Sequence, residues 1–469
     1  MLRPVAISCL VAALALPALP RTRPHYGGVL HVEVAGDPMQ SPGGLARGLI
    51  FDGLASLAAD GSLHPALALN WESGDNFHRW EFQLRPGVRF QDGTPLTADA
   101  VVRSLNASCT SDCPWSSAAA VGSSVVFTGD SPIPNLPVLL AGDRFLISLT
   151  VDANGQIPTT PTGTGPFQLT SNTNGVLTLT ANVTCWQGRP FVDSLQILAN
   201  RSIRDQWLDL SVGRADVVQV PPEMIREARL QQFTVVASPP VDLLTLQIAS
   251  AGPLSSASLR ASIAQAVDRA PLLNVIFQKQ GAVSASLLPQ SLTGYAFLFP
   301  SSRDLAKAQA LRGGVTPPPL QLSYTGGAAM QLVAQRLSLN LREDGFNVQV
   351  VPASSAPTAA LALRTLPLLP AEPSAALETL LRADGQPIPV SDDRLAGLYQ
   401  AEREFLDLHT LVPLLDLPRA WAVSGRVRDL TLRTDGSPDL ADASLEDSSR
   451  DAPENAPGNA PQSVPGNAP

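Results

Sequence analysis

Apolar and polar residues alternate with a period of two along several short stretches, and this is the pattern of a strand with one buried face. In residues 27–35, Leu30, Val32 and Val34 fall on one side of such a strand. The same pattern returns in three later stretches, residues 80–84, 192–198 and 320–324. The sequence therefore predicts sheet structure distributed over the whole chain.

Residues 71–105 combine strands, turns and a helix in a short space. After the strand at 80–84, the Pro-Gly pair at 86–87 predicts one turn and the Asp-Gly pair at 92–93 predicts another. A helix should follow, with Thr97 as its N-cap, because a threonine hydroxyl can accept from the free N–H groups of the first turn. We expect a hairpin packed against one helix.

A strand, a helix and a second strand follow one another at residues 320–324, 330–341 and 348–350. This order predicts a parallel pair of strands with a crossover helix, as in α/β folds. Four apolar residues form one stripe on that helix, Met330, Val333, Leu337 and Leu341. A stripe at this spacing indicates a core face rather than a cofactor site.

The first 20 residues have the order of a signal peptide. Arg3 precedes the apolar run 5–16, and small residues and prolines follow up to Pro20. The run is shorter than the about 20 residues that a membrane helix needs. Cys9 lies inside the run rather than after it, so a lipoprotein is not expected. We expect a protein that is secreted, periplasmic or otherwise extracytoplasmic.

Length and charge narrow the class of protein. A chain of 469 residues is long enough for two or three domains. Its net charge of -9 gives it no electrostatic reason to bind nucleic acid or an anionic membrane.

Besides Cys9, the chain contains Cys109, Cys113 and Cys185. Outside the cytoplasm two nearby thiols tend to oxidise, which favours a disulfide between Cys109 and Cys113. A zinc site is the alternative, but two further ligands at suitable spacing are missing and the five histidines are scattered. We expect no metal.

The sequence contains no H-E-x-x-H, G-x-S-x-G or Walker motif, so we expect no enzyme activity and no cofactor. Residues 162–169, TGTGPFQL, contain a lone G-x-G, which predicts a turn before a strand rather than a phosphate loop. We expect Gly163 and Gly165 to be needed there for positive φ angles.

Residues 71–105 resemble the outline W-E-x-S-x-D-x-x-x-W-x-F-x-L-R-P-G-V-x-F-x-D-G-T-P-L-T-A-x-D-V. Residues 182–190, NVTCWQGRP, and 258–269, SLRASIAQAVDR, supply two more motifs. Together they resemble the extracytoplasmic solute-binding proteins of family 5, which serve ABC importers of peptides and nickel chelates. The resemblance implies an α/β, bilobal class II periplasmic-binding-protein fold with an additional side subdomain in lobe one.

From this resemblance we expect a chain that leaves lobe one, builds lobe two and returns. The expected units are a signal peptide at 1–20, lobe one at 21–57, the side subdomain at 58–157, lobe one again at 158–250, lobe two at 251–404, a return segment at 405–437 and a disordered Asn/Ala/Pro-rich tail at 438–469.

Peptide-binding members of the family carry a lobe-two segment whose aspartate receives the terminal ammonium of the peptide and whose tryptophan lines the pocket. Aligned with that segment, this chain has Leu366 at the tryptophan position and Leu369 at the aspartate position, with Arg364 nearby. An ammonium buried against leucine would lack a charge partner. The resemblance therefore implies a wall suited to apolar or anionic groups, unless an alignment shift makes Glu372 or Asp384 the acidic residue.

Five further residues are candidates for ligand contact, Asp37, Met39, Gln40, Trp186 and Trp421. For the tryptophans a core position is at least as good an explanation. The implied function is capture of a small solute or peptide and its delivery to an ABC permease by a monomeric receptor. The alternative is a degenerate scaffold that acts through protein contacts without capturing a ligand.

Overall fold

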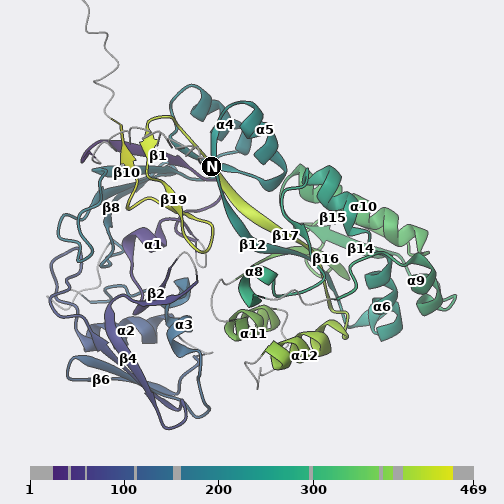
Figure 1. Cartoon of the computed structure of the whole chain (residues 1–469), viewed down its shortest axis with the longest axis horizontal. Coiled ribbons are helices and arrows are strands. Elements are labelled where there is room, and N and C mark those ends of the chain that lie inside the picture. Colours follow the sequence, from purple (N-terminus) through teal and green to yellow (C-terminus); the bar gives the residue numbers. More distant parts are fainter. Residues whose placement is uncertain are drawn as a thin grey trace, which may run out of the picture.

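The computed structural model describes residues 25–40, 44–58, 61–109, 113–151, 160–294, 299–368, 373–383 and 395–446. Two lobes lie side by side, and the strands β12 (Thr234–Ile248) and β17 (Leu411–Val423) run from one to the other (Figure 1). Both belong to an eleven-stranded sheet with the order β15-β14-β16-β12-β17-β11-β1-β10-β9-β8, and β13 also pairs with β17.

Lobe one is built on the β11 to β8 end of this sheet. Its strands are β1 (Val29–Glu33), β8 (Phe167–Thr173), β9 (Val176–Ala181), β10 (Ser194–Leu198) and β11 (Val217–Val220), and its helices are α1 (Arg47–Ile50), α4 (Ile203–Ser211) and α5 (Ile225–Leu230). Strand β1 is parallel to β10 and β11. Leu30, Val32 and Val34 are buried on it, as the alternation predicts.

The side subdomain lies below α1 in Figure 1. Its sheet has the order β4-β5-β7-β6. Its elements are β2 (Ala55–Leu57), β3 (Leu63–Pro65), β4 (Ala68–Gly74), β5 (Arg79–Leu84), β6 (Ser117–Val121), β7 (Ser124–Thr128), α2 (Ala98–Ser108) and α3 (Leu136–Leu140). The Thr97 side chain accepts a 3.2 Å hydrogen bond from the N–H of Ala100, which confirms the predicted cap.

Aromatic packing holds this subdomain together. The rings of Phe82 and Phe127 meet edge to face with centroids 5.4 Å apart, and Trp115 contacts Phe127 at 5.0 Å. The indole N–H of Trp80 donates to the carbonyl of Ile133 at 2.9 Å. Such pairs contribute about 0.5 to 1.5 kcal/mol beyond the burial of their area.

Gln91, in the second turn of the 71–105 stretch, joins the side subdomain to lobe one. Its amide donates to the carbonyl of Ile50 at 3.0 Å and accepts from the N–H of Gly163 at 2.9 Å. Neither Gly163 nor Gly165 has a positive φ, so that expectation is wrong. A Cβ atom would lie 2.0 Å from the carbonyl oxygen of Ile50 at Gly163, and 2.6 Å from that of Leu49 at Gly165. Close backbone approach, not φ, requires glycine here.

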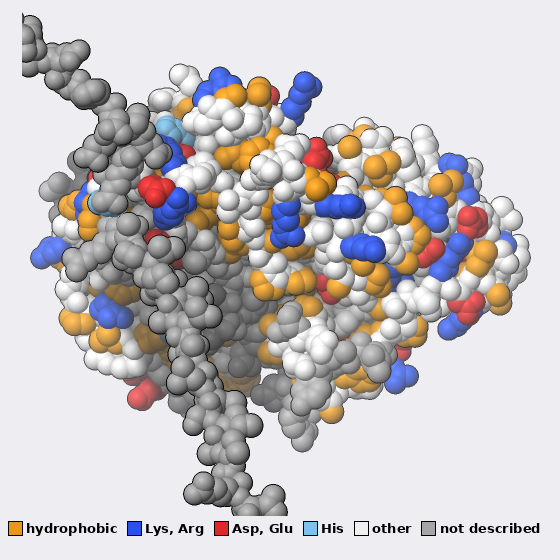
Figure 2. Space-filling model, turned by 45° about the horizontal axis from the view of Figure 1, so that its top comes forward, with side chains coloured by type: hydrophobic (Ala, Val, Ile, Leu, Met, Phe, Trp, Pro, Cys, Tyr) orange, Lys and Arg blue, Asp and Glu red, His pale blue; other side chains and the backbone are white. Residues whose placement is uncertain are grey.

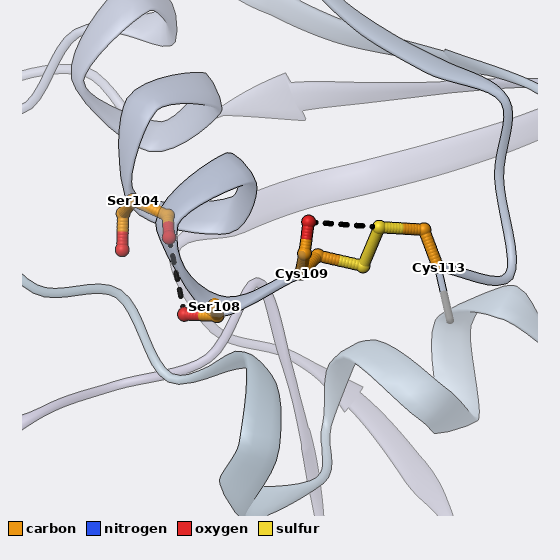
Figure 3. Close-up of a disulfide and its surroundings, with 4 residues drawn as sticks. All are labelled: Ser104, Ser108, Cys109 and Cys113. Carbon is orange, nitrogen blue, oxygen red and sulfur yellow. Dashed lines mark hydrogen bonds between the residues drawn. A yellow bond between two sulfur atoms is a disulfide. The ribbon is translucent and has the colours of Figure 1, made fainter. Parts of the chain in front are cut away.

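Cys109 and Cys113 form a disulfide just after α2, with Cα atoms 5.4 Å apart (Figure 3). The Cys113 sulfur lies 3.2 Å from the carbonyl oxygen of Cys109. Because a bridged sulfur carries no hydrogen, this is a sulfur–oxygen contact. Cys185 is a free thiol, 8% exposed, and burial raises its pKa.

We expect this thiol pattern in the protein purified without its first 20 residues. Labelling without denaturant should modify none of the three remaining cysteines, because two are oxidised and the third is buried. After unfolding and reduction, mass spectrometry should count three labels. Modification of two or more cysteines in the folded, unreduced protein would contradict the pairing.

Lobe two occupies the other end of the large sheet. Its strands are β13 (Ala282–Val283), β14 (Leu320–Tyr324), β15 (Val348–Pro352) and β16 (Leu361–Pro367), and its helices are α6 (Ala257–Ala266), α7 (Arg269–Pro271), α8 (Gln290–Thr293), α9 (Leu305–Arg312), α10 (Ala328–Glu343), α11 (Pro373–Ala383) and α12 (Leu395–Leu406). Strand β14 is parallel to β15, and Val333, Leu337 and Leu341 are buried, as predicted. Helices α6, α9 and α10 lie on one side of the lobe-two sheet, and α8, α11 and α12 lie on the other (Figure 1).

The large buried residues form separate cores in lobe one, the side subdomain and lobe two. Between the lobes, the β12–β17 ladder changes register on either side of Pro240. Pro239, Pro240 and Pro418 lie at this point, and proline cannot donate to a ladder. The structure confirms the predicted α/β bilobal fold and places the crossing point at these prolines.

Lobe one continues past residue 437, where the fold was expected to end. Strands β18 (Val427–Arg428), β19 (Thr431–Leu432), β20 (Pro438–Asp439) and β21 (Ser444–Leu445) form two small antiparallel pairs. The start of the tail at 438 is therefore wrong, because Leu440 and Ala443 are fully buried in the lobe-one core. Residues 447–469 and the expected signal peptide lie outside the described residues. Within the part that is described, no helix has the length and apolar character needed to cross a membrane.

Candidate functional site

The two lobes approach each other where the side subdomain of lobe one meets α11 of lobe two. The amide of Asn135, before α3, donates to the hydroxyl of Ser374 on α11 at 3.5 Å. Figure 2 shows Lys and Arg side chains spread over the surface of lobe two, at the right of the view. The face of the lobe-two sheet that carries α8, α11 and α12 is therefore the one turned toward lobe one.

The loop after β1 leads into helix α1 and carries three of the candidate residues, Asp37, Met39 and Gln40. The carboxylate of Asp37 accepts from the N–H of Met39 at 2.8 Å, and the N–H of Gly44 donates to the carbonyl of Gln40 at 2.8 Å. Asp37 and Gln40 are exposed, whereas Met39 is half-buried against the lobe-one core. The loop thus presents two polar side chains from a hydrogen-bonded turn.

Trp186 is fixed between lobe one and the side subdomain. Its indole N–H donates to the carboxylate of Asp52 at 2.9 Å, and the guanidinium of Arg85 lies 4.7 Å from the centre of its ring. Asp52 also accepts from the hydroxyl of Thr164 at 2.7 Å. Burial raises the pKa of Asp52, while these hydrogen bonds favour its charged form. Trp186 has the contacts of a structural residue.

The hairpin of β19 and β20 packs on β12 and β17, the hinge strands that join the two lobes (Figure 1). Arg419 of β17 makes two 2.8 Å contacts with the carboxylate of Asp242 on β12, and it donates to the carbonyl of Asp435 at 3.0 Å. The indole N–H of Trp421 donates to the carbonyl of Gly436 at 3.0 Å. Trp421 is only 5% exposed, so the structure places it in the core of lobe one.

Arg433, in the turn of this hairpin, is exposed and was missed by the sequence analysis. Its guanidinium lies against α1, with Nη1 3.4 Å from the carbonyl oxygen of Gly48. A Cβ atom on Gly48 would lie 2.5 Å from that nitrogen, so glycine leaves room for the arginine. The Asp-Gly pair at 435–436 signals a turn, but no local pattern indicates that the turn meets α1.

Arg364 and Leu366 lie on β16 and point to the face that carries α8, α11 and α12. Strand register places Leu366 beside Leu243, and Leu243 beside Asp416 of β17. Leu366 packs against the core under α11 and α12, whereas Arg364 is exposed. Of the other lobe-two candidates, Leu369, Glu372 and Asp384 lie outside the described residues.

Two carboxyl groups, those of Glu402 and Asp416, are buried on the side of lobe two that carries α12. Glu402 of α12 accepts from the hydroxyl of Ser286 at 2.7 Å and from the N–H of Leu287. Glu402 is 0% exposed and Asp416 is 7% exposed. Burial raises the pKa of each to about 7, and for Glu402 the nearby Asp416 adds to the effect. One oxygen of each carboxyl group has no hydrogen-bond partner among the described residues.

A separate surface hollow of about 450 Å³ lies at the lobe-one ends of the hinge strands, between residues 210–216, 232–234 and 423–426. Its most polar side is the ion pair of Asp216 with Arg426. Burial opposes the charge of Asp216, but hydrogen bonds from Arg426 hold its pKa below the usual range. Because that pair already satisfies its charges and lies away from the facing walls, we place the candidate site at the lobe boundary.

The chain is similar in sequence to proteins that are named as peptide-binding proteins. The chain is 28% identical over 280 residues to the probable D,D-dipeptide-binding periplasmic protein DdpA of Escherichia coli, covering 55% of this chain and 54% of that protein. It is 24% identical over 341 residues to the probable di/tripeptide-binding protein 5 of Pseudomonas aeruginosa, covering 63% and 65%. The chain thus spans about half the length of DdpA.

Solved structures share the fold. NikA from Staphylococcus aureus in complex with Ni(L-His)2 superimposes with a TM-score of 0.75 at 17% identity, covering 89% of this chain and 100% of that one. The oligopeptide-binding protein AppA from Bacillus subtilis in complex with a nonapeptide gives 0.75 at 16% identity, covering 91% and 100%.

A family model agrees with both sets of relatives and confirms the resemblance seen in the motifs. The model for bacterial extracellular solute-binding proteins, family 5 Middle, matches residues 62–367, which is more than half of the chain. The chain therefore belongs to the family 5 bacterial extracellular solute-binding proteins.

Proposed function

We propose that this chain is the substrate-binding component of an ABC transporter, which captures a small solute between its lobes and delivers it to a membrane permease. The observation that carries this proposal is the pair of separately packed lobes joined by β12 and β17, with irregular pairing at the proline-rich crossing point. Such a connection allows hinge closure around a ligand. Only a solute that contacts both lobes stabilises the closed form.

The proposed contacts come from both walls. Lobe one offers Asp37 and Gln40, with Met39 beside them, and lobe two offers Arg364 and Leu366. From the alignment, Leu369 and Glu372 remain proposed contacts, whereas Trp186 and Trp421 support the lobe-one wall from behind.

The solute class follows from the relatives. DdpA is named for D,D-dipeptides, the Pseudomonas protein for di- and tripeptides, and NikA was solved with a nickel–histidine complex. We propose a solute of this size, a short peptide or another small polar molecule, for this chain. We further propose a monomer without catalytic activity that is exported through its first 20 residues.

Native purification tests the proposal. Small molecules carried with the protein should be released by denaturation and detected by mass spectrometry, and the released compound should raise the melting temperature of protein refolded without it. N-terminal sequencing of the exported protein should begin near residue 21.

The second candidate is a scaffold that keeps the fold but captures no solute. The alignment that puts Leu369 at the position of the acidic residue favours it. No released compound, no thermal shift across a library of peptides and metal chelates, and no permease and ATPase genes beside this one would together support that alternative.

A further inference from the structure

Arg419 lies at the point where the two hinge strands cross from one lobe to the other. Pairing of β12 with β17 is regular on the lobe-one side up to Ala237 and resumes on the lobe-two side at Asp242. Between these residues the ladder pairs Pro240 with Pro418 and shifts its register on both sides. Because proline cannot donate to a ladder, side-chain contacts have to supply part of the connection here.

Arg419 makes contacts on both sides of this break. Its backbone N–H donates to the hydroxyl of Ser238 at 3.0 Å, and Ser238 precedes the two prolines of β12. Its guanidinium makes two 2.8 Å contacts with the carboxylate of Asp242, which follows those prolines. The same guanidinium donates to the carbonyl of Asp435, in the turn between β19 and β20, at 3.0 Å. Arg419 therefore joins the lobe-one hairpin to the first lobe-two residues of β12.

The turn that Arg419 contacts is fixed to the core of lobe one. Gly436 has a φ of +77°, and a Cβ atom there would lie 2.9 Å from the Cβ of Arg419 and 3.0 Å from a methyl group of Val241. The carbonyl of Gly436 accepts from the indole N–H of Trp421, which is buried. The turn thus lies directly on both hinge strands, and glycine allows this close approach.

The ion pair is partly shielded from water. The Asp242 side chain is 15% exposed and the Arg419 side chain is 36% exposed. A carboxylate held by two parallel N–H groups in such a place contributes more than an ordinary surface pair. Rotation of lobe two about the prolines would move Asp242 relative to Asp435 and Ser238. Arg419 could then keep its lobe-one contacts or its lobe-two contact, but not both.

We propose that Arg419 is a hinge clamp: together with Asp242 and the carbonyl of Asp435, it holds the lobes in the arrangement seen in the structure and has to release Asp242 when that arrangement changes. This inference goes beyond the proposed function, because it concerns the lobes of the solute-free protein. A solute that requires another arrangement must compete with the clamp, so the clamp sets part of the equilibrium between the two forms.

Electron–electron double resonance between spin labels on the two lobes tests the clamp without a solute. Labels at Ser211→Cys on α4 and Gln335→Cys on α10 occupy exposed positions, while the native cysteines of the described chain are bridged or buried. Arg419→Gln and Asp242→Asn should each increase the population of distances outside the wild-type peak about three- to tenfold. The double variant should match the single variants, because each removes the same pair.

Salt gives a second measurement that needs no variant of the clamp. At about 1 M salt the Debye length falls to about 3 Å, so the wild-type distances should shift toward those of Arg419→Gln. The distances of Arg419→Gln itself should change little. Arg419→Lys should lie between the two proteins, because an ammonium group cannot form the two parallel contacts of a guanidinium.

Arg428→Gln is the matched control. Arg428 is an exposed arginine of the same C-terminal segment, but its ion pair with Glu446 lies within lobe one. This variant should keep the wild-type distances, and circular dichroism should show which variants fold. If Arg419→Gln does not fold, Asp242→Asn and the salt series decide. The same distances in the wild type and Asp242→Asn at both salt concentrations would overturn the inference, and so would an equally large shift in Arg428→Gln.

Discussion

Gly163→Ala is expected to lower the free energy of unfolding by about 3 kcal/mol, a large effect for one methyl group. The added Cβ would lie 2.0 Å from the carbonyl oxygen of Ile50, which is backbone and cannot move as a flexible side chain can. That oxygen accepts from Gln91 and from the N–H of Gly165. The substitution should therefore loosen the connection between lobe one and the side subdomain.

Urea denaturation followed by circular dichroism measures this loss. Gly74→Ala is the control, because a Cβ at Gly74 would have no neighbour within 4 Å and its φ is not in the left-handed region. It should change stability by less than about 0.5 kcal/mol. If both variants lost the same stability, close approach at Gly163 would not be the reason for glycine there.

Glu402→Gln is expected to stabilise the protein at alkaline pH and to flatten its stability profile. Burial raises the folded-state pKa of Glu402 from 4.5 to about 7. The folded protein then holds a proton that the unfolded chain has released, so stability is full below about pH 4.5 and is lost as the pH rises through about 7. This difference corresponds to about 3 kcal/mol for a fully buried carboxyl group. Asp416 behaves in the same direction and adds to the loss.

Melting temperatures between pH 5 and 9 test this expectation. The wild type should become less stable across this range, and Glu402→Gln should lose less, because the amide cannot ionise yet its oxygen can still accept from Ser286 and Leu287. Glu404→Gln is the control. It removes one negative charge from an exposed position on the same helix, and its stability profile should match that of the wild type. A profile for Glu402→Gln that matches the wild type would show that this carboxyl group does not hold the proton.

The sequence pattern alone predicted those features that depend on a single strand, helix or short run of elements. The alternation in residues 27–35 identified β1 and its buried side chains, and the residue type at Thr97 identified the start of α2. The strand, helix and strand at 320–350 predicted the parallel pair in lobe two. These predictions hold because hydrophobic period and capping depend on neighbours within a few residues.

The sequence by itself also determined the family, through motifs that build the side subdomain and lobe two. It did not determine the reason for Gly163, the extension of lobe one to residue 446 or the place of Arg433. Each of these depends on segments far apart in the chain, Ile50 beside Gly163 and Gly48 beside Arg433. The burial that raises the pKa of Glu402 likewise comes from β17 and the segment before α8. Only the tertiary structure decides such contacts, because packing and desolvation depend on what folds against a residue rather than on what precedes it.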